Sequence, residues 1–427
     1  MVNNSDTIFA LSTPYGRSGV ATFRVSGALP CHELRSLLSL PSLAPRYASL
    51  CQLVDQQGNK VDDVVATYFP APNSFTGEDV LEISCHGSVA ILAQIEALLG
   101  GRTGWRQAQP GEFARRAFRN QKIDLAEAEG LADVLEAKTI RQLKHAQRGA
   151  WGANSAAVQA WRQQILELQA LAEAVIDFSE DLDEDIDDTI TNTAKQFAGD
   201  LDQALRRGNS VAQLQAGYTV ALVGAPNAGK SSLLNALTQT QAAIVTDLPG
   251  TTRDQITVEV NIDGLPVKLV DTAGLRETDD HIEQIGVARS RQAIVEADLV
   301  LHVVRPGTAP EPIDGALRVY THADVKKDGV YSVSSITREG IDSLLALISK
   351  SLAADLPAPD EVAFSNARQQ SAVARAVHEL QSVTFGAPLD IRAQHLRYAS
   401  QALSEITGDI DVEDVLDQIF GNFCIGK

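Results

Sequence analysis

The pattern of apolar and polar positions changes character along the chain. Up to about residue 118, short apolar runs are typical of half-buried strands, and one helical pattern follows them. The strand-like runs lie at 8–11, 19–25, 64–69 and 80–85, and the helical pattern lies at 89–99. From residue 112 to 214, turn signals nearly vanish and apolar residues recur at helical spacing. The chain is therefore expected to begin with an α+β domain and to continue into long helices.

A third pattern begins at Tyr218, where strand, loop, helix and strand alternate. This alternation is typical of an α/β domain. The strands are expected at 219–223, 256–262, 267–270, 299–304 and 317–320, with a helix at 232–237. After Pro357 and Pro359, helical patterns return at 371–383, 394–407 and 412–420. Because either helical half alone would leave an apolar face unburied, we expect the α/β domain to be inserted into one helical domain.

The predicted fold is α+β and multidomain. The expected parts are an N-terminal α/β domain over 1–118, helical segments over 119–214 and 357–427, and an inserted P-loop α/β domain over 215–356. The length of 427 residues suits two or three domains. A hydrophobic content of 44% and a charged content of 21% are ordinary for a soluble globular protein.

The chain is acidic, with 36 Lys and Arg against 55 Asp and Glu and a formal net charge of −19. Such a surface repels polyanions, which argues against broad coating of DNA or RNA. Nucleic acid would have to be held by a local basic patch or delivered by a partner. The candidate patches are Arg115, Arg116, Arg119 and Lys122, and the helical stripe Lys138, Arg141, His145 and Arg148. Ordinary solvated helix faces are the favoured alternative for both.

The four cysteines, Cys31, Cys51, Cys85 and Cys424, are widely spaced and show no metal-binding pair. A reducing cytosol is the simplest compartment for them. The chain has neither a signal-peptide pattern nor an apolar stretch long enough to span a membrane. We therefore expect a cytoplasmic protein.

Residues 224–231 match the phosphate-loop pattern G-x-x-x-x-G-K-S, directly after an apolar strand and before a helix. In this motif, backbone N–H groups close around the phosphates at the helix N-terminus. Lys230 would supply a cation to the β- and γ-phosphates, and the Ser231 hydroxyl would bind Mg²⁺. The expected nucleotide contacts of this segment are Asn227, Ala228, Gly229, Lys230, Ser231 and Ser232.

Two further segments fit the same kind of site. Asp271, Thr272, Ala273 and Gly274 close a strand, where Asp271 would hold Mg²⁺ through water and the Gly274 N–H would meet the γ-phosphate. Between the two motifs lies an expected switch segment with a threonine ligand for Mg²⁺. Its candidate residues are Thr246, Asp247, Leu248, Pro249, Gly250, Thr251 and Thr252.

The base-recognition segment departs from the usual GTPase pattern. GTPases commonly use Asn-Lys-x-Asp, and this chain has Thr321-His322-Ala323-Asp324. Asp324 would accept hydrogen bonds from guanine, so guanine preference is expected with weakened base binding. Downstream, the usual Ser-Ala-Lys is replaced by Ser334, Ser335 and Ile336. The connection over 305–315 is also too short for a full crossover helix.

The residue that follows Gly274 is Leu275, and not the glutamine that orients the attacking water in Ras-like enzymes. Another group must therefore perform that task. A bound monovalent cation is one candidate, with Asn227 of the phosphate loop as a ligand.

These motifs and their flanks resemble the MnmE (TrmE) family of tRNA-modification GTPases, and the similarity covers essentially the whole chain. The segments that carry it are 6–8, 14–16, 23–27, 75–82, 86–87, 110–113, 120–129 and the terminal 423–427. The resemblance implies an N-terminal folate-binding domain that forms a homodimer, a helical domain, and an inserted GTPase domain.

The resemblance also implies an activity. With an FAD-containing partner, MnmG, the family adds a carboxymethylaminomethyl or aminomethyl group to C5 of the wobble uridine, U34, of certain tRNAs. A folate such as 5-formyl-tetrahydrofolate is the implied one-carbon donor. Hydrolysis of GTP is implied to be stimulated by K⁺ and coupled to movement of two GTPase domains toward each other.

Family likeness assigns roles to particular residues. Asn227, Thr246, Leu248 and Thr251 match positions that bind K⁺, and Ser231 and Thr252 match Mg²⁺ ligands. Glu283 matches a glutamate that helps to orient water, and Arg24, Glu82, Lys122 and Lys427 match folate-contacting positions. Cys424 matches a C-terminal cysteine that could serve chemistry near the folate or uridine, and a buried structural thiol is about as favoured.

Two other interpretations remain open from the sequence. The central motifs alone also fit a GTP-dependent assembly or ribosome-associated switch without folate chemistry. That interpretation would leave four residues without a role, namely Arg24, Glu82, Lys122 and Lys427. The altered segment 321–324 also suits a degenerate GTPase domain in a folate- and partner-binding scaffold. Four intact residues, Lys230, Ser231, Thr252 and Asp271, argue against this second alternative.

Overall fold

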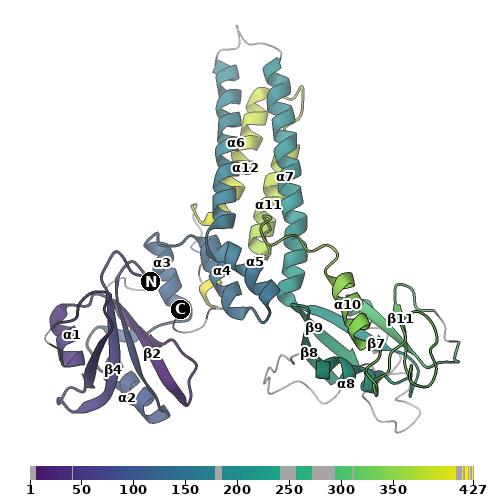
Figure 1. Ribbon diagram of the computed structural model, residues 1–427. Coiled ribbons are helices and arrows are strands. Elements are labelled where there is room, and N and C mark those ends of the chain that lie inside the picture. Colours follow the sequence, from purple (N-terminus) through teal and green to yellow (C-terminus); the bar gives the residue numbers. More distant parts are fainter. Residues whose placement is uncertain are drawn as a thin grey trace, which may run out of the picture. The chain divides into compact units, whose positions relative to one another are not determined.

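The computed structural model describes residues 6–40, 42–177, 185–240, 256–271, 294–309, 312–409, 416, 419–421, 423 and 426. The chain divides into two compact units (Figure 1). The first unit contains residues 1–132 and 404–427, and the second contains residues 133–403. Within the described part of the chain, no helix is both long enough and apolar enough to cross a membrane.

The first unit is built on a six-stranded sheet with the strand order β3-β4-β5-β2-β1-β6. Its strands are β1 (Thr7–Leu11), β2 (Ser18–Gly27), β3 (Ser49–Val54), β4 (Lys60–Phe69), β5 (Asp79–Gly87) and β6 (Trp105–Gln107). Helices α1 (Cys31–Leu38) and α2 (Val89–Gly100) supply Leu37 and Ile95 to a core with Phe23 and Ile83 of the sheet. The sequence pattern predicts four of these strands and α2, whereas β3, β6 and α1 are absent from that prediction.

The C-terminal segment belongs to the first unit, together with α3 (Glu112–Arg119) and the start of α4 (Leu125–Glu136). Phe420 and Phe423 pack with Leu125 in one core, and the Phe420 ring lies 5.5 Å from that of Phe423. Gly111 has φ +65°, and a Cβ there would collide with the Phe420 carbonyl. The sequence pattern assigns the whole of 357–427 to the helical domain. In the structure, the described Leu416, Phe420 and Phe423 instead pack in this core of the first unit, because their apolar side chains complete it.

The second unit contains a helical bundle (Figure 1). Its helices are α5 (Ile140–Ala150), α6 (Ala153–Asp177), α7 (Asp185–Ala216), α11 (Ala367–Gln381) and α12 (Leu389–Thr407). Apolar side chains at helical spacing are buried in it, among them Ile165, Leu201 and Leu380. Helix α11 packs along α7, so the α/β domain lies in the chain between two helices of one bundle.

The α/β part of this unit has a five-stranded sheet with the strand order β11-β10-β7-β9-β8. Its elements are β7 (Tyr218–Val223), α8 (Lys230–Thr240), β8 (Ile256–Ile262), β9 (Leu265–Asp271), β10 (Leu299–Val304), β11 (Leu317–Tyr320) and α10 (Ile341–Leu352). All neighbouring strands are parallel except β8 and β9. Strand β10 pairs with β11 without a helix in the described residues between them, which agrees with the short connection. The carboxyl ends of β7, β9 and β10 meet at one edge, where ligands of such sheets bind.

Candidate functional sites

The phosphate loop joins the end of β7 to the start of α8. Gly224 has φ +153°, and a Cβ there would collide with the carbonyl of Val303 on β10. Gly229 has φ +95° and Asn227 has φ +60°, so the loop takes a compact left-handed course. This course brings successive backbone N–H groups toward the N-terminus of α8, which favours an anion.

Lys230 folds back over this loop. Its Nζ donates hydrogen bonds to the carbonyl oxygens of Gly224 at 2.8 Å and Ala225 at 2.9 Å, and only 5% of the residue is exposed. Burial lowers the pKa of Lys230, while the nearby carboxylate of Asp271 raises it. The amine is therefore held over the loop by neutral carbonyls, which a phosphate oxygen can replace as a stronger acceptor.

Ser231 and Asp271 meet at the sheet edge. The Ser231 Oγ donates a hydrogen bond of 2.6 Å to Oδ2 of Asp271, which is fully buried at the end of β9. A hydroxyl and a carboxylate beside a phosphate loop fit the oxygen ligands that Mg²⁺ prefers. These two residues would hold the ion, which would neutralise phosphate charge. The described residues contain no cluster of three His, Cys, Asp or Glu side chains that could bind a metal.

Asp324 follows β11 in the segment expected to contact the base. The Ser334 Oγ donates a hydrogen bond of 2.6 Å to its Oδ1, and Ser334 itself is fully buried. This hydrogen bond, more than any other contact, lowers the pKa of Asp324. Ile336, by contrast, is 82% exposed. The carboxylate is thus ionised and oriented at the surface, as an acceptor for the N–H groups of a base must be.

Several candidate residues lie outside the described residues. They are Thr246, Asp247, Leu248, Pro249, Gly250, Thr251, Thr252, Thr272, Ala273, Gly274, Glu283, Cys424 and Lys427. The described part of the nucleotide site therefore consists of the phosphate loop, Asp271, and the base segment of Asp324 and Ser334.

A second polar cluster lies on the sheet of the first unit. Arg24 on β2 and Glu82 on β5 stand directly opposite in register, with Nη2 and Oε1 2.8 Å apart. Nη1 of Arg24 also donates to the Gly426 carbonyl at 3.5 Å, and the guanidinium lies 5.7 Å from the Phe75 ring. Gly426 has φ +103° and accepts a hydrogen bond from Ser12 at 3.3 Å.

This cluster brings together Arg24, Glu82 and Gly426, which directly precedes Lys427, although the three are far apart in sequence. Lys122 is exposed, and its side-chain stem lies beside Gly77. The Arg24 guanidinium also lies 5.9 Å from the centre of the Phe113 ring. A guanidinium held against a carboxylate and two aromatic rings can bind a flat, polar heteroaromatic ligand through paired hydrogen bonds and ring contact. Sequence spacing alone indicates none of this, because the cluster depends on strand pairing and on the return of the C-terminus.

Three residues of the basic stripe, Lys138 just before α5 and Arg141 and Arg148 on it, are paired within the chain, so the nomination of this α5 stripe as a nucleic-acid patch is not supported. Lys138 pairs with Glu259 on β8 at 2.8 Å, and Arg141 pairs with Asp263 in the β8–β9 turn. Arg148 donates to the carbonyl oxygen of Asp360. Arg116, nominated in the other patch, is also unsuitable because it is 4% exposed and is paired with the buried Glu112 and the partly buried Glu78.

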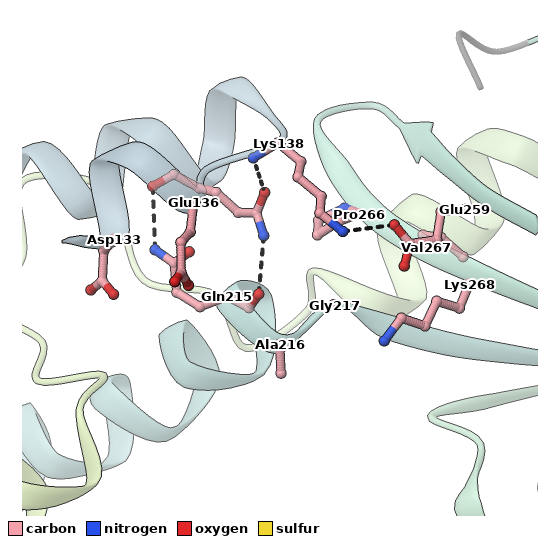
Figure 2. A pocket seen from close by; sticks show the side chains of 11 residues that line it. Asp133, Glu136, Lys138, Gln215, Ala216, Gly217, Glu259, Pro266, Val267 and Lys268 are labelled. Atoms are coloured by element: carbon pink, nitrogen blue, oxygen red, sulfur yellow. Dashed lines mark hydrogen bonds and ion pairs between the residues drawn. The ribbon is translucent and has the colours of Figure 1, made fainter. Parts of the chain in front are cut away.

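Helix α5 also contacts the point where the α/β domain begins. Nε2 of Gln142 donates to the carbonyl oxygens of Leu214 and Gln215, each at 3.1 Å. These hydrogen bonds satisfy two carbonyl groups in the last turn of α7 that have no partner within the helix. A cavity of about 380 Å³ lies between this corner and the β8–β9 hairpin (Figure 2). Figure 2 shows Lys138 extended toward Glu259 across it. The stripe therefore attaches the helical part to the α/β domain.

The phosphate loop, the strand-end aspartate and the aspartate-bearing base segment define a P-loop GTP-binding protein. Comparison with known families agrees: the model of the MnmE helical domain matches residues 125–424, and that of the GTP-binding protein TrmE N-terminus matches residues 7–122. The chain belongs to the MnmE family of tRNA modification GTPases. The resemblance and fold class inferred from sequence are thereby confirmed, and the chain is a GTP hydrolase.

Individual relatives match along their full length. The tRNA modification GTPase MnmE of Parvibaculum lavamentivorans is 42% identical over 443 residues, covering 99% of this chain and 100% of the relative. That of Erythrobacter litoralis is 42% identical over 430 residues, with the same coverage. That of Agrobacterium fabrum is 38% identical over 442 residues and covers 100% of both chains.

Proposed function

We propose that this GTPase acts in the cytoplasm as a homodimer with an FAD-containing partner of the MnmG type. Together they add an aminomethyl or carboxymethylaminomethyl group at C5 of the wobble uridine of tRNA, with a folate as one-carbon donor. The observation that carries the proposal is that one chain of this family holds an intact phosphate site, with Lys230, Ser231 and Asp271, and a separate Arg24–Glu82 cluster. The GTP-dependent switch alternative uses only the first of these sites.

The charges of the chain support a division of labour with the partner. The net charge is −19, and the α5 stripe is occupied by intramolecular pairs. Affinity for nucleic acid rests largely on phosphate contacts to Lys and Arg. We therefore assign most of the tRNA affinity to the partner.

In the proposed mechanism, Lys230 and the backbone N–H groups of the phosphate loop hold the β- and γ-phosphates. Ser231, Asp271 and Thr252 would hold Mg²⁺, which supplies charge neutralisation. Asn227, Thr246, Leu248 and Thr251 would hold K⁺ where other GTPases place an arginine finger, and Glu283 would orient water. Leu275 offers no hydrogen bond to water, so hydrolysis needs such substitutes.

The rate of GTP hydrolysis by the full chain should be about tenfold or more higher in KCl than in NaCl at matched ionic strength. An arginine finger contributes roughly 10³ to 10⁵ in rate, and a cation at the same position supplies part of that charge. Phosphate release is measured in both salts, with ATP as the competing nucleotide. Asn227→Ala should lose the preference for KCl. Equal rates in both salts would exclude K⁺-assisted catalysis, and equal use of ATP would show that base specificity is lost.

Titration of 5-formyl-tetrahydrofolate into the full chain should give saturable binding that Arg24→Ala weakens by about 10- to 100-fold. The substitution removes charge-assisted hydrogen bonds worth roughly 1.5–3 kcal/mol and leaves Glu82 without its cation. Isothermal calorimetry measures the affinity. Arg35→Ala, an exposed arginine on α1, is the matched control and should bind like the unmodified chain. Absence of folate binding by the folded, unmodified protein would favour the switch alternative.

A further inference from the structure

The hydroxyl of Thr321 connects two loops of the nucleotide site. Thr321 is 3% exposed, and its Oγ1 donates to the carbonyl oxygen of Ala228 in the phosphate loop at 2.7 Å. The same oxygen lies 3.3 Å from the Val304 carbonyl at the end of β10. A Cβ on Gly229 would lie 3.3 Å from Cγ2 of Thr321, so the two loops are in close packing. The base segment, residues 321–324, is thus held to the phosphate loop by the hydrogen bond of one buried side chain.

The same hydroxyl fixes the imidazole of His322. Nδ1 of His322 lies 2.9 Å from Oγ1 of Thr321. A hydroxyl carries one hydrogen, and that hydrogen is donated to a backbone carbonyl, so Oγ1 must accept from Nδ1–H. The proton of the neutral ring is therefore on Nδ1, and Nε2 is left as an acceptor. Because Nδ1 is hydrogen-bonded to the hydroxyl of the buried Thr321, the ring has a fixed orientation.

The backbone keeps this ring next to Asp324. His322 has φ +56°, and its carbonyl accepts hydrogen bonds from the N–H groups of Val325 and Lys326 at 3.0 and 3.1 Å. This turn places Asp324 at its surface, where Ser334 orients the carboxylate. His322 is partly exposed, so a face of the ring remains available beside an oriented acceptor.

We propose that Thr321 and His322 form the base pocket with Asp324: Thr321 attaches the base segment to the phosphate loop, and the imidazole of His322 is the surface against which the guanine ring stacks. The inference rests on the proposed function of this site as the GTP site and specifies how it holds the base. Imidazole rings stack on nucleobases, and Asp324 supplies the hydrogen-bonding edge. Thr321 and His322, which stand where other GTPases have Asn and Lys, therefore still form a base pocket, with different side chains.

Binding of a fluorescent N-methylanthraniloyl-GDP to the full chain tests this pocket. His322→Ala should weaken binding about 10- to 100-fold, the range for loss of one stacked base. His322→Phe keeps a flat ring without its nitrogens and should stay within about threefold of the unmodified chain. His378→Ala, an exposed histidine on α11, is the matched control and should leave binding unchanged.

Thr321→Val tests the attachment, because it removes the hydroxyl and keeps the shape. It should weaken binding about tenfold and speed nucleotide release, whereas Thr308→Val on an exposed loop should do neither. Thermal unfolding of each variant shows whether the domain remains folded.

The outcomes separate the pocket from the function on which it rests. The stacking role is overturned if His322→Ala binds GDP as tightly as the unmodified chain. It is also overturned if His322→Phe binds as weakly as His322→Ala. Unchanged binding by folded Thr321→Val overturns the attachment. If the unmodified chain binds no guanine nucleotide, the proposed function itself fails.

Discussion

Replacing Lys230 with alanine should lower the rate of GTP hydrolysis by at least about 100-fold, the cost of losing one preorganised donor to developing charge. The amine is held 2.8 and 2.9 Å from two carbonyls of the phosphate loop, so its position costs little reorganisation when phosphate arrives. It is also nearly buried, where a charge acts more strongly than in water. Phosphate release from the full chain measures the effect.

Lys350→Ala is the matched control, because Lys350 is an exposed lysine on α10 of the same domain. Its rate should equal that of the unmodified chain. Undiminished hydrolysis by Lys230→Ala would mean that the measured activity comes from a contaminant. The degenerate-scaffold interpretation would then gain support.

Local sequence signals predict the strands and helix α8 of the α/β domain well, because each is encoded within a few neighbouring residues, whereas α10 is absent from that prediction. The glycines of 224–229 permit positive φ, and the short, β-branched apolar run that they bound favours a buried strand. Strand β6 is missed because three residues carry no periodicity. Helix α1 is missed because eight residues after Pro30 give only two turns.

Contacts between segments that are distant in the chain are harder to predict from the sequence. A basic stripe for nucleic acid and a basic stripe that pairs with Glu259 and Asp263 have the same helical spacing, and only tertiary structure distinguishes them. The Arg24–Glu82 pair likewise depends on the register of β2 with β5. Family resemblance nominates these two residues, and residue-level reasoning from spacing does not. The role of Thr321 as a link to Ala228 is also invisible in the sequence, since 93 residues separate the two.

Replacing Arg116 with leucine should destabilise the first unit by about 3–5 kcal/mol, the usual cost of removing one partner from a buried ion pair. Nη2 of Arg116 lies 3.1 Å from Oε1 of Glu112, and its Nη1 lies 2.9 Å from Oε2 of Glu78. Nη1 also donates to the Asp6 carbonyl at 2.9 Å. Both Arg116 and Glu112 are nearly buried. Hydrogen exchange in β2 and β5 during urea unfolding reports this unit separately from the other. Arg119→Leu, on the exposed end of the same helix, should change stability by less than about 0.5 kcal/mol.

The loss should also depend on pH. Burial raises the pKa of Glu112, but hydrogen bonds from Arg106 and the Gln109 N–H, with the charges of Arg106 and Arg116, bring it below its ordinary value of 4.5. A lowered folded-state pKa contributes stability above the unfolded pKa, and that stability is lost as pH falls through the folded value. Arg116→Leu removes one cause of the lowering, so the difference between the two proteins should be largest near neutral pH. The difference should shrink as the pH falls below about 4.5 and through the lowered folded-state pKa of Glu112. A difference that stays constant over this acid range would show that the ion pair is not its source.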